Sequence, residues 1–142
     1  EKLNERKVPA MAFFHMPPAE FKEAYEKMKL GDHSVSYEHG SIGEKDEYFG
    51  ISNRPPHFFE KAVDNGWLKW IFCGHDHLNT LSLTYKGIRM TYGMSIDYLG
   101  YSGIAKQYIQ RGATLITRKT DGNIDITMVP LTTVVSTRVR GA

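Results

Sequence analysis

The chain has 142 residues, which is long enough for one compact domain with its own core. With 24% charged residues and a formal net charge of +2, it favours neither a nucleic-acid nor an acidic partner. No apolar run approaches the ~20 residues that span a bilayer, and the single cysteine, Cys73, excludes an intrachain disulfide. We therefore expect no nucleic-acid partner and no membrane partner.

The amino-terminal part is predicted to form a strand followed by a helix. The apolar run Val8–Phe14 predicts a buried strand that ends at His15. Pro17-Pro18 favours the start of a helix, and apolar residues then recur at three- and four-residue spacing as far as Leu30. The charged residues 1–7 are expected to be a frayed lead-in.

A long polar and glycine-rich segment, residues 32–54, is predicted to be an irregular loop over the face that carries the functional residues. His33 and His39 within it are expected to be solvated rather than to bind a ligand. The glutamates of this loop are expected to be solvated as well: Glu38, Glu44 and Glu47.

A second helix and an apolar strand follow this loop. Pro55-Pro56 favours the start of the helix, and Asn65-Gly66 favours its end. Trp67–Cys73 predicts a buried strand in which Cys73 is a core thiol. Trp70 either lies in the core or stacks on a substrate.

The rest of the chain is predicted to be an antiparallel meander. Leu81–Tyr85 and Ile88–Tyr92 alternate in polarity around a tight turn, and Asp121-Gly122 is a hairpin signal between strands 113–117 and 124–129. The order β-α-loop-α-β followed by a meander indicates an α/β (α+β) class with a mixed sheet, in a single domain of residues 1–142.

Two further segments allow alternative interpretations. Residues 93–111 are rich in glycine and tyrosine, so they form either a loop that cups a ligand or an ordinary surface loop. The tyrosines of this loop are Tyr92 at its start, Tyr98, Tyr101 and Tyr108. Residues 131–142 form either an edge strand or a tail.

Polar residues crowd together directly after the apolar strand, in Gly74-His75-Asp76-His77 and in Asn79. Such a position is where open α/β sheets place their sites. In an extended segment, side chains two residues apart lie on the same side, so His75 and His77 are expected to face one pocket. Two converging imidazoles are typical of half of a transition-metal site, although His-x-His pairs also arise by chance.

These residues carry a resemblance to a known family. G-H-x-H after a hydrophobic strand resembles the last motif of the calcineurin-like metallophosphoesterases, and FFHMP, which contains His15, resembles the metal-ligand histidine motif that precedes it. The pattern FFHMP … E … GHDHLN … Y-x-G-I … YG … GY … RGA is most similar to the purple-acid-phosphatase-related branch. The resemblance covers about residues 8–129.

The family's three earlier motifs, D-x-H, G-D-x-x-D and G-N-H-[D/E], have no match in these 142 residues. The chain therefore resembles the carboxyl-terminal half of a metallophosphoesterase, which implies half of a two-sheet, helix-flanked sandwich. Its first residue, Glu1, fits a processed or excised piece.

The resemblance also implies a set of ligands and a reaction. His15 and His75 would bind the second metal, and His77 the first, in a dinuclear Zn, Fe or Mn site that hydrolyses phosphate esters with a metal-bound hydroxide. Because the missing motifs would supply the other ligands, we expect this chain alone to bind one ion or none and to be nearly inactive. The alternative is a non-catalytic binding or structural module that keeps the scaffold.

Other residues near the histidines have roles that the sequence leaves open. Asp76 either fixes a histidine tautomer or the loop, or caps nearby backbone amides. The same alternatives apply to Asn79. Asn79, Tyr98 and Tyr101 are also candidates to bind the substrate, and in the family the loop 32–54 approaches the substrate.

A half-sandwich exposes the apolar sheet face that would pack against its missing sheet. We expect the missing amino-terminal half, or a second copy of the chain, to cover this face.

Overall fold

The computed structural model of the protein describes residues 4–51, 57–106 and 109–131. The chain divides into two compact units, Glu1–Gly93 and Met94–Ala142. The elements are β1 (Ala10–Phe14), α1 (Ala19–Lys29), β2 (Val35–His39), η1 (Lys45–Glu47), α2 (His57–Asn65), β3 (Leu68–Cys73), β4 (Ser82–Tyr85), β5 (Ile88–Tyr92), η2 (Ile104–Lys106), β6 (Gly112–Arg118) and β7 (Ile124–Pro130). No helix within these ranges is long and apolar enough to cross a membrane.

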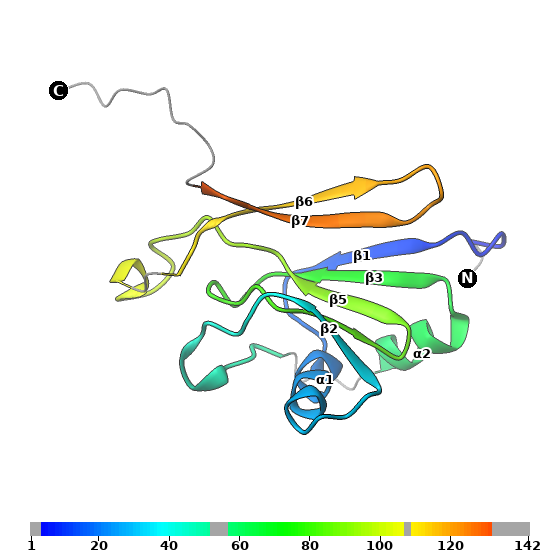
Figure 1. Ribbon diagram of the computed structural model, residues 1–142, viewed down its shortest axis with the longest axis horizontal. Helices are drawn as coiled ribbons and strands as arrows, with labels where there is room; N and C mark the ends of the chain where they lie inside the picture. The colour runs from blue at the N-terminus through cyan, green and yellow to red at the C-terminus, as the bar shows by residue number, and fades with distance from the viewer. Residues whose placement is uncertain (1–3, 52–56, 107–108, 132–142) are drawn as a thin grey trace. The chain divides into compact units, whose positions relative to one another are not determined.

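The first unit is built on a five-stranded mixed sheet with the order β1-β3-β5-β4-β2 (Figure 1). Strands β1, β3 and β5 are parallel to one another, whereas β4 is antiparallel to β5 and β2 is antiparallel to β4. The β4–β5 hairpin turns at Lys86-Gly87, where both residues have positive φ. The three parallel strands therefore end at the same edge of the sheet.

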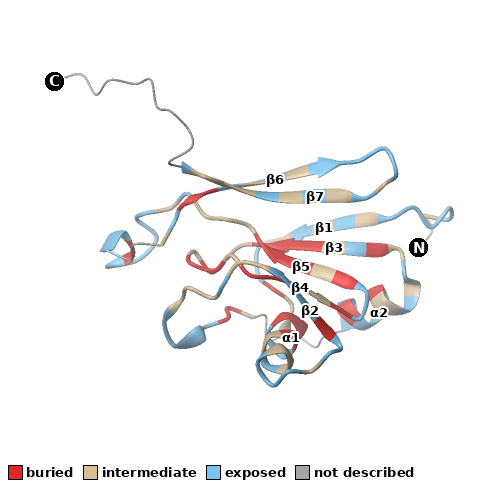
Figure 2. Ribbon diagram, in the orientation of Figure 1, coloured by how far each residue is buried: buried red, intermediate tan, exposed pale blue. Residues whose placement is uncertain are grey.

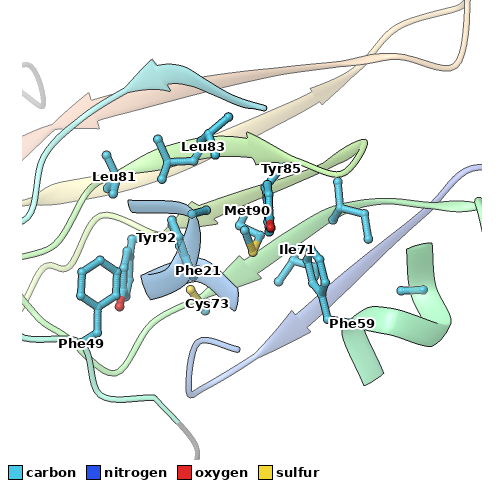
Figure 3. Close-up of a cluster of buried hydrophobic side chains, with 14 of the residues drawn as sticks. Phe21, Phe49, Phe59, Ile71, Cys73, Leu81, Leu83, Tyr85, Met90 and Tyr92 are labelled. Atoms are coloured by element: carbon cyan, nitrogen blue, oxygen red, sulfur yellow. The ribbon is translucent and has the colours of Figure 1, made fainter. Parts of the chain in front are cut away.

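The core lies between one face of this sheet and the two helices α1 and α2. Phe21 of α1 stacks on Tyr92 of β5 at 4.9 Å between ring centroids, and Phe59 of α2 stacks on Tyr85 of β4 at 6.2 Å (Figure 3). Burial is concentrated in the middle strands and on the inner sides of the helices (Figure 2). Cys73 lies in this core and its thiol pKa is raised by burial, which confirms the prediction of a buried thiol.

The opposite face of the sheet carries an apolar strip at its β1 edge. Alternate residues of β1 point away from the core, and the register pairs Met11 with Trp70 and Phe13 with Phe72. The Phe13 and Phe72 rings stack at 5.0 Å, but Phe13 is still 63% exposed. Trp70 is half-buried and belongs to this face rather than to the helix-covered core. We call Met11, Phe13, Trp70 and Phe72 the apolar strip.

The second unit consists of the two-stranded antiparallel sheet β6-β7 and the loop before it. The hairpin turn contains Gly122 at φ +87°, as the Asp-Gly signal predicts. Inside the loop, the short η2 turn buries Ile104.

The predicted α/β (α+β) class with a mixed sheet is confirmed, and it is consistent with half of a sandwich. The prediction of a wholly irregular loop at 32–54 is wrong, because this segment contains β2. As an edge strand, β2 buries Val35 but leaves its central residues exposed, so it lacks the apolar pattern that marks the other strands.

Some predictions lie outside the described residues: the helix start at Pro55-Pro56, Tyr108, and the edge strand or tail at 132–142. The assignment of residues 1–142 to a single phosphoesterase domain stays a prediction.

Candidate functional site

The candidate site lies where β1 and β3 end side by side. Their parallel pairing continues beyond the last strand residues, because the Gly74 amide donates to the His15 carbonyl at 3.0 Å. On the other side of β3, the Gly93 amide donates to the Cys73 carbonyl at 2.8 Å. His15 and the Gly74-His75 turn are therefore neighbours at the carboxyl edge of the sheet, which is the expected location of a site in such a fold.

Two of the predicted metal ligands meet at this edge. Nε2 of His15 and Nδ1 of His75 are 3.0 Å apart, and the two rings lie at 80° with their centroids 4.9 Å apart. At 3.0 Å the pair has the spacing of a ring-to-ring hydrogen bond, whereas two nitrogens that bind one tetrahedral ion at about 2.1 Å are about 3.4 Å apart. The two rings would therefore have to separate by a few tenths of an ångström, about 0.4 Å, to bind one transition-metal ion together.

The backbone at His75 is turned rather than extended. His75 has φ +70°, the Asp76 amide donates to the Gly74 carbonyl at 2.9 Å, and the Asn79 amide donates to the Asp76 carbonyl at 3.4 Å. Positive φ is uncommon for a residue other than glycine and often marks a functional site. The sharp turn after β3 is thus made by His75 itself.

Because of this turn, the two-residue spacing of His75 and His77 no longer places both side chains on one side of the backbone by itself. The expectation that His75 and His77 face the same side rested on an extended backbone, which this segment does not have, so a shared pocket for the two side chains stays a prediction. Within the described ranges, no group of three or more His, Cys, Asp or Glu side chains is arranged to hold a metal ion. The structure brings His15 and His75 together, and the assignment of His77 as a ligand stays a prediction.

Asp76 is buried and holds a second segment of the chain against the site. Its carboxylate oxygens accept the Gly50 amide at 3.1 and 2.9 Å, and Oδ2 also accepts the Tyr92 hydroxyl at 2.6 Å. Of the roles left open by the sequence, the contacts of Asp76 are those of a cap on a backbone amide, and this cap fixes the distant loop beside His75.

Asn79 is fully buried and anchors the same loop. Its Oδ1 accepts the amides of Gly43 and Glu44 at 3.0 and 3.1 Å, and its Nδ2 donates to the Tyr48 carbonyl at 3.1 Å. The side chain has no exposed surface and its contacts hold the loop, and the assignment of Asn79 to substrate binding stays a prediction.

The loop 40–50 is therefore ordered by contacts with the turn 74–80. The Thr80 amide donates to the Ser41 carbonyl at 2.9 Å, and the Leu78 amide donates to Oε1 of Glu44 at 3.0 Å. A β-carbon at Gly40 would lie 2.0 Å from the Thr80 carbonyl oxygen, so this close approach requires glycine. We call residues 40–50 the bracing loop.

The three glutamates expected to be solvated all accept hydrogen bonds from the protein. Glu44 binds the Leu78 amide, Glu47 accepts the hydroxyl of Tyr25, and Glu38 accepts the hydroxyl of Thr84 at 2.7 Å. Glu38 and Glu47 are exposed as expected and Glu44 is half-buried, and their hydrogen bonds also tie the 32–54 segment to the rest of the first unit.

His39 differs from its expected solvated state, whereas His33 is exposed as expected. Nδ1 of His39 accepts a hydrogen bond from the Arg89 guanidinium at 3.1 Å, and its Nε2 is buried without a hydrogen-bond partner. Burial and, second, the charge of Arg89 lower the pKa of His39. It lies at the end of β2 and is held neutral by its surroundings.

In the second unit, Arg111 organises the glycine- and tyrosine-rich loop. Its fully buried guanidinium donates to the carbonyls of Asp97, Ile109 and Ile104, and it lies 5.2 Å from the ring centroid of Tyr98. Tyr98 is 45% exposed and Tyr101 is 43% exposed. Both tyrosines thus have accessible rings, and their assignment to substrate binding stays a prediction.

The fold and the paired histidines define a mixed α/β scaffold with imidazoles at the carboxyl edge of its parallel strands. Sequence comparison finds the chain similar to proteins that are named as purple acid phosphatases. The chain is 28% identical over 93 residues, 66% of its length, to a protein named probable inactive purple acid phosphatase 29, and 31% identical over 93 residues to one named probable inactive purple acid phosphatase 28. It is 38% identical over 47 residues, 33% of its length, to probable inactive purple acid phosphatase 14; all three are from Arabidopsis thaliana.

The predicted resemblance to the purple-acid-phosphatase-related branch is therefore confirmed. The chain spans about a fifth or less of the length of these curated relatives, 21%, 12% and 20%. No family model matches the chain. No solved structure matches it either.

Sequence reasoning missed two residues of the site. Gly50 approaches His75 more closely than any side chain would allow, and the Tyr92 hydroxyl contacts Asp76. Gly50 has no local signal, because its importance comes from a contact with a segment 26 residues away. Tyr92 was expected to end a strand and to belong to the tyrosines of the glycine-rich loop, so its contact with Asp76 was not foreseen, although the polar tip of a buried tyrosine generally requires a partner.

Proposed function

We propose that this chain supplies the carboxyl-terminal metal ligands of a metal-dependent phosphoesterase. The observation that carries the proposal is the 3.0 Å separation of His15 Nε2 and His75 Nδ1 at adjacent ends of parallel strands. The similarity to purple acid phosphatases supports the substrate class, a phosphate ester. A pair of Zn, Fe or Mn ions, when bound, activates water and neutralises the phosphoryl oxygens.

Each residue of this chain then has a defined task. His15 and His75 each supply one ring nitrogen to the same ion, and His77 supplies a further donor in the complete domain. The bracing loop, held by Asp76 and Asn79, fixes the turn 74–80 that carries His75. Because these histidines provide too few donors for two ions, the remaining ligands come from the amino-terminal half, and this chain alone is inactive or nearly so.

A second candidate is a non-catalytic module that retains the phosphoesterase scaffold. Two observations favour it: the relatives are named as probable inactive phosphatases, and no group of three metal-competent side chains forms within the described residues. Under this alternative, the histidine pair is a structural hydrogen bond and the bracing loop serves a binding surface.

Metal titration of single histidine variants distinguishes the two candidates. Calorimetry with Zn²⁺ and Mn²⁺ should show one site in the wild-type chain, lost in His15→Ala and in His75→Ala. His33→Ala is the matched control, because His33 is exposed on a different loop and should leave binding unchanged. Wild-type binding that survives His75→Ala would contradict the proposed site.

Activity is then tested with an activated aryl phosphate. The chain alone should show no hydrolysis above metal-free controls, and adding a separately expressed amino-terminal half should restore hydrolysis that depends on His75. If the reassembled domain binds metal but remains inactive, the non-catalytic module is correct.

We also propose that the apolar strip is covered by the amino-terminal half, with a second copy of the chain in its place when that half is absent. Phe13 is 63% exposed and Met11 is 38% exposed, and they lie beside Trp70 on the sheet face opposite the helices. Apolar surface of this kind drives association.

A further inference from the structure

Gly50 lies in direct contact with the ring of His75. A β-carbon added at Gly50 would be 2.0 Å from Cδ2 and 2.5 Å from Nε2 of His75, distances that no real β-carbon can adopt. It would also be 2.7 Å from Oδ1 of Asp76. The backbone of Gly50 therefore occupies the space behind the imidazole, on the side opposite the nitrogen that faces His15.

The position of Gly50 relative to His75 is set by the residue that follows His75. Both carboxylate oxygens of Asp76 accept the Gly50 amide, at 3.1 and 2.9 Å, and the carboxylate is itself held by the Tyr92 hydroxyl at 2.6 Å. These contacts are buried, so each hydrogen bond would be costly to break. Asp76, itself held by Tyr92, thus keeps the Gly50 backbone in contact with the His75 imidazole.

This contact decides which edge of the His75 ring faces His15. The ring presents Nδ1 toward His15 at 3.0 Å and presents its Cδ2–Nε2 edge to Gly50. A larger residue at position 50 must displace either the His75 ring or the segment that carries Gly50, and the hydrogen bonds from the Gly50 amide to Asp76 oppose movement of that segment. His75 also has φ +70°, an uncommon conformation for a residue other than glycine that persists only where the surroundings hold it.

We infer that Gly50 is a positioning residue for the metal site, acting through the imidazole of His75. This inference rests on the proposed function, in which His15 and His75 bind the same ion. It assigns a second role to the bracing loop: its last residue, Gly50, fixes the orientation of the His75 ring, which lies on another segment. Groups that orient a ligand in this way typically change metal affinity by about 10- to 100-fold when altered.

The test compares Gly50→Ala with Gly93→Ala. Both glycines lie outside the left-handed region of φ, and a β-carbon at Gly93 would have its nearest neighbour, the Cys73 carbonyl oxygen, at an ordinary 3.6 Å. Gly50→Ala should weaken Zn²⁺ binding about 10- to 100-fold by calorimetry. In the metal-free protein it should also abolish the ring-to-ring NMR contact between His15 and His75, whereas Gly93→Ala should change neither quantity.

The two readouts separate the inference from the proposed function. If the wild-type chain binds no metal, the proposed function fails, but loss of the ring contact in Gly50→Ala still supports positioning. If Gly50→Ala keeps both the wild-type affinity and the ring contact, positioning by Gly50 is overturned. Should Gly50→Ala not fold, Asp76→Asn replaces it, because one carboxamide oxygen must then accept both the Gly50 amide and the Tyr92 hydroxyl. In that variant, an unchanged ring contact together with faster exchange of the Gly50 amide would overturn the inference. A lost ring contact would support it.

Discussion

The hydroxyl of Tyr92 donates a 2.6 Å hydrogen bond to Oδ2 of Asp76, and both side chains are buried. Burial and, after it, the bond to Asp76 raise the pKa of Tyr92, so this hydroxyl keeps its proton and remains a donor. The bond joins the end of β5 to the turn that carries His75. One side chain of the core thereby supports the geometry of the site.

Tyr92→Phe should lower the free energy of unfolding by about 1.5–3 kcal/mol, because a buried charged acceptor loses one of its donors. The ring itself should still pack, since it stacks on Phe21 at 4.9 Å between centroids. Tyr85→Phe is the control: its hydroxyl donates to Glu23 in a partly buried position, so a loss of only about 0.5–1.5 kcal/mol is expected. Urea unfolding of both variants measures the difference, and equal losses would contradict the special role of the Tyr92–Asp76 bond.

Asn79→Ala should release the middle of the bracing loop. The amides of Gly43 and Glu44 lose their shared acceptor, so their hydrogen exchange should accelerate about tenfold or more, the equivalent of about one net hydrogen bond. The Gly50 amide, held by Asp76, should exchange at its wild-type rate.

Asn79→Asp provides the matched control for this experiment. It keeps an oxygen for the two amides but removes the donor to the Tyr48 carbonyl, so protection of Gly43 and Glu44 should largely remain. If exchange in Asn79→Ala accelerates equally at all three amides, the loop is not held by separate anchors.

Most of the fold could be predicted from the sequence because its strands and helices carry strong apolar patterns. Trp67–Cys73 and Ile88–Tyr92 were found in this way, and the structure has β3 and β5 there. The edge strand β2 was not predicted because its central residues face solvent. An edge strand can form without the alternating apolar residues that mark a strand in the sequence.

The site was harder to predict, and its two histidines show why. His15 and His75 each end a buried strand, so their convergence follows from parallel strand order. The direction of His77 does not follow from spacing, because His75 adopts a left-handed conformation that reverses the chain. Gly50 could not be found at all, since its value depends on a contact with a segment far away in the sequence.

Arg111→Met should loosen the loop of the second unit. The buried guanidinium donates to the carbonyls of Asp97, Ile109 and Ile104, and methionine of similar length would leave all three without this donor. Limited proteolysis should then cut within residues 97–106 at least several-fold faster than in the wild type. Arg118→Met, at an exposed position on β6, is the control and should leave the cleavage rate unchanged.

Acidification should destabilise the first unit through His39. Its pKa in the folded state is lowered from 6.5 by burial, so the unfolded chain binds a proton more readily. Stability from this residue is therefore fully present above about pH 6.5 and is lost as the pH falls through the lowered folded value. The charged groups that face it are Arg89, which lowers the pKa, and Glu38, which raises it.

His39→Asn tests this pH dependence, because asparagine keeps an acceptor for Arg89 but does not titrate. Urea midpoints measured at pH 7.5, 6.5 and 5.0 should fall less on acidification in the variant than in the wild type. If wild type and variant lose stability in parallel, other groups account for the acid sensitivity.

Phe13→Lys should abolish self-association of the isolated chain. Phe13 lies in the middle of the apolar strip and is 63% exposed. A lysine at this position would have to lose its hydration when the proposed partner covers the strip, and burial of an unpaired charge is unfavourable. Leu30→Lys is the control: Leu30 is 87% exposed but lies at the end of α1, away from the strip.

Sedimentation at increasing concentration should show association for the wild type and for Leu30→Lys, and a monomer for Phe13→Lys. Because the amino-terminal half is proposed to cover the same surface, adding it should also dissociate the wild-type oligomer. An oligomer that persists in Phe13→Lys would show that a different surface drives association.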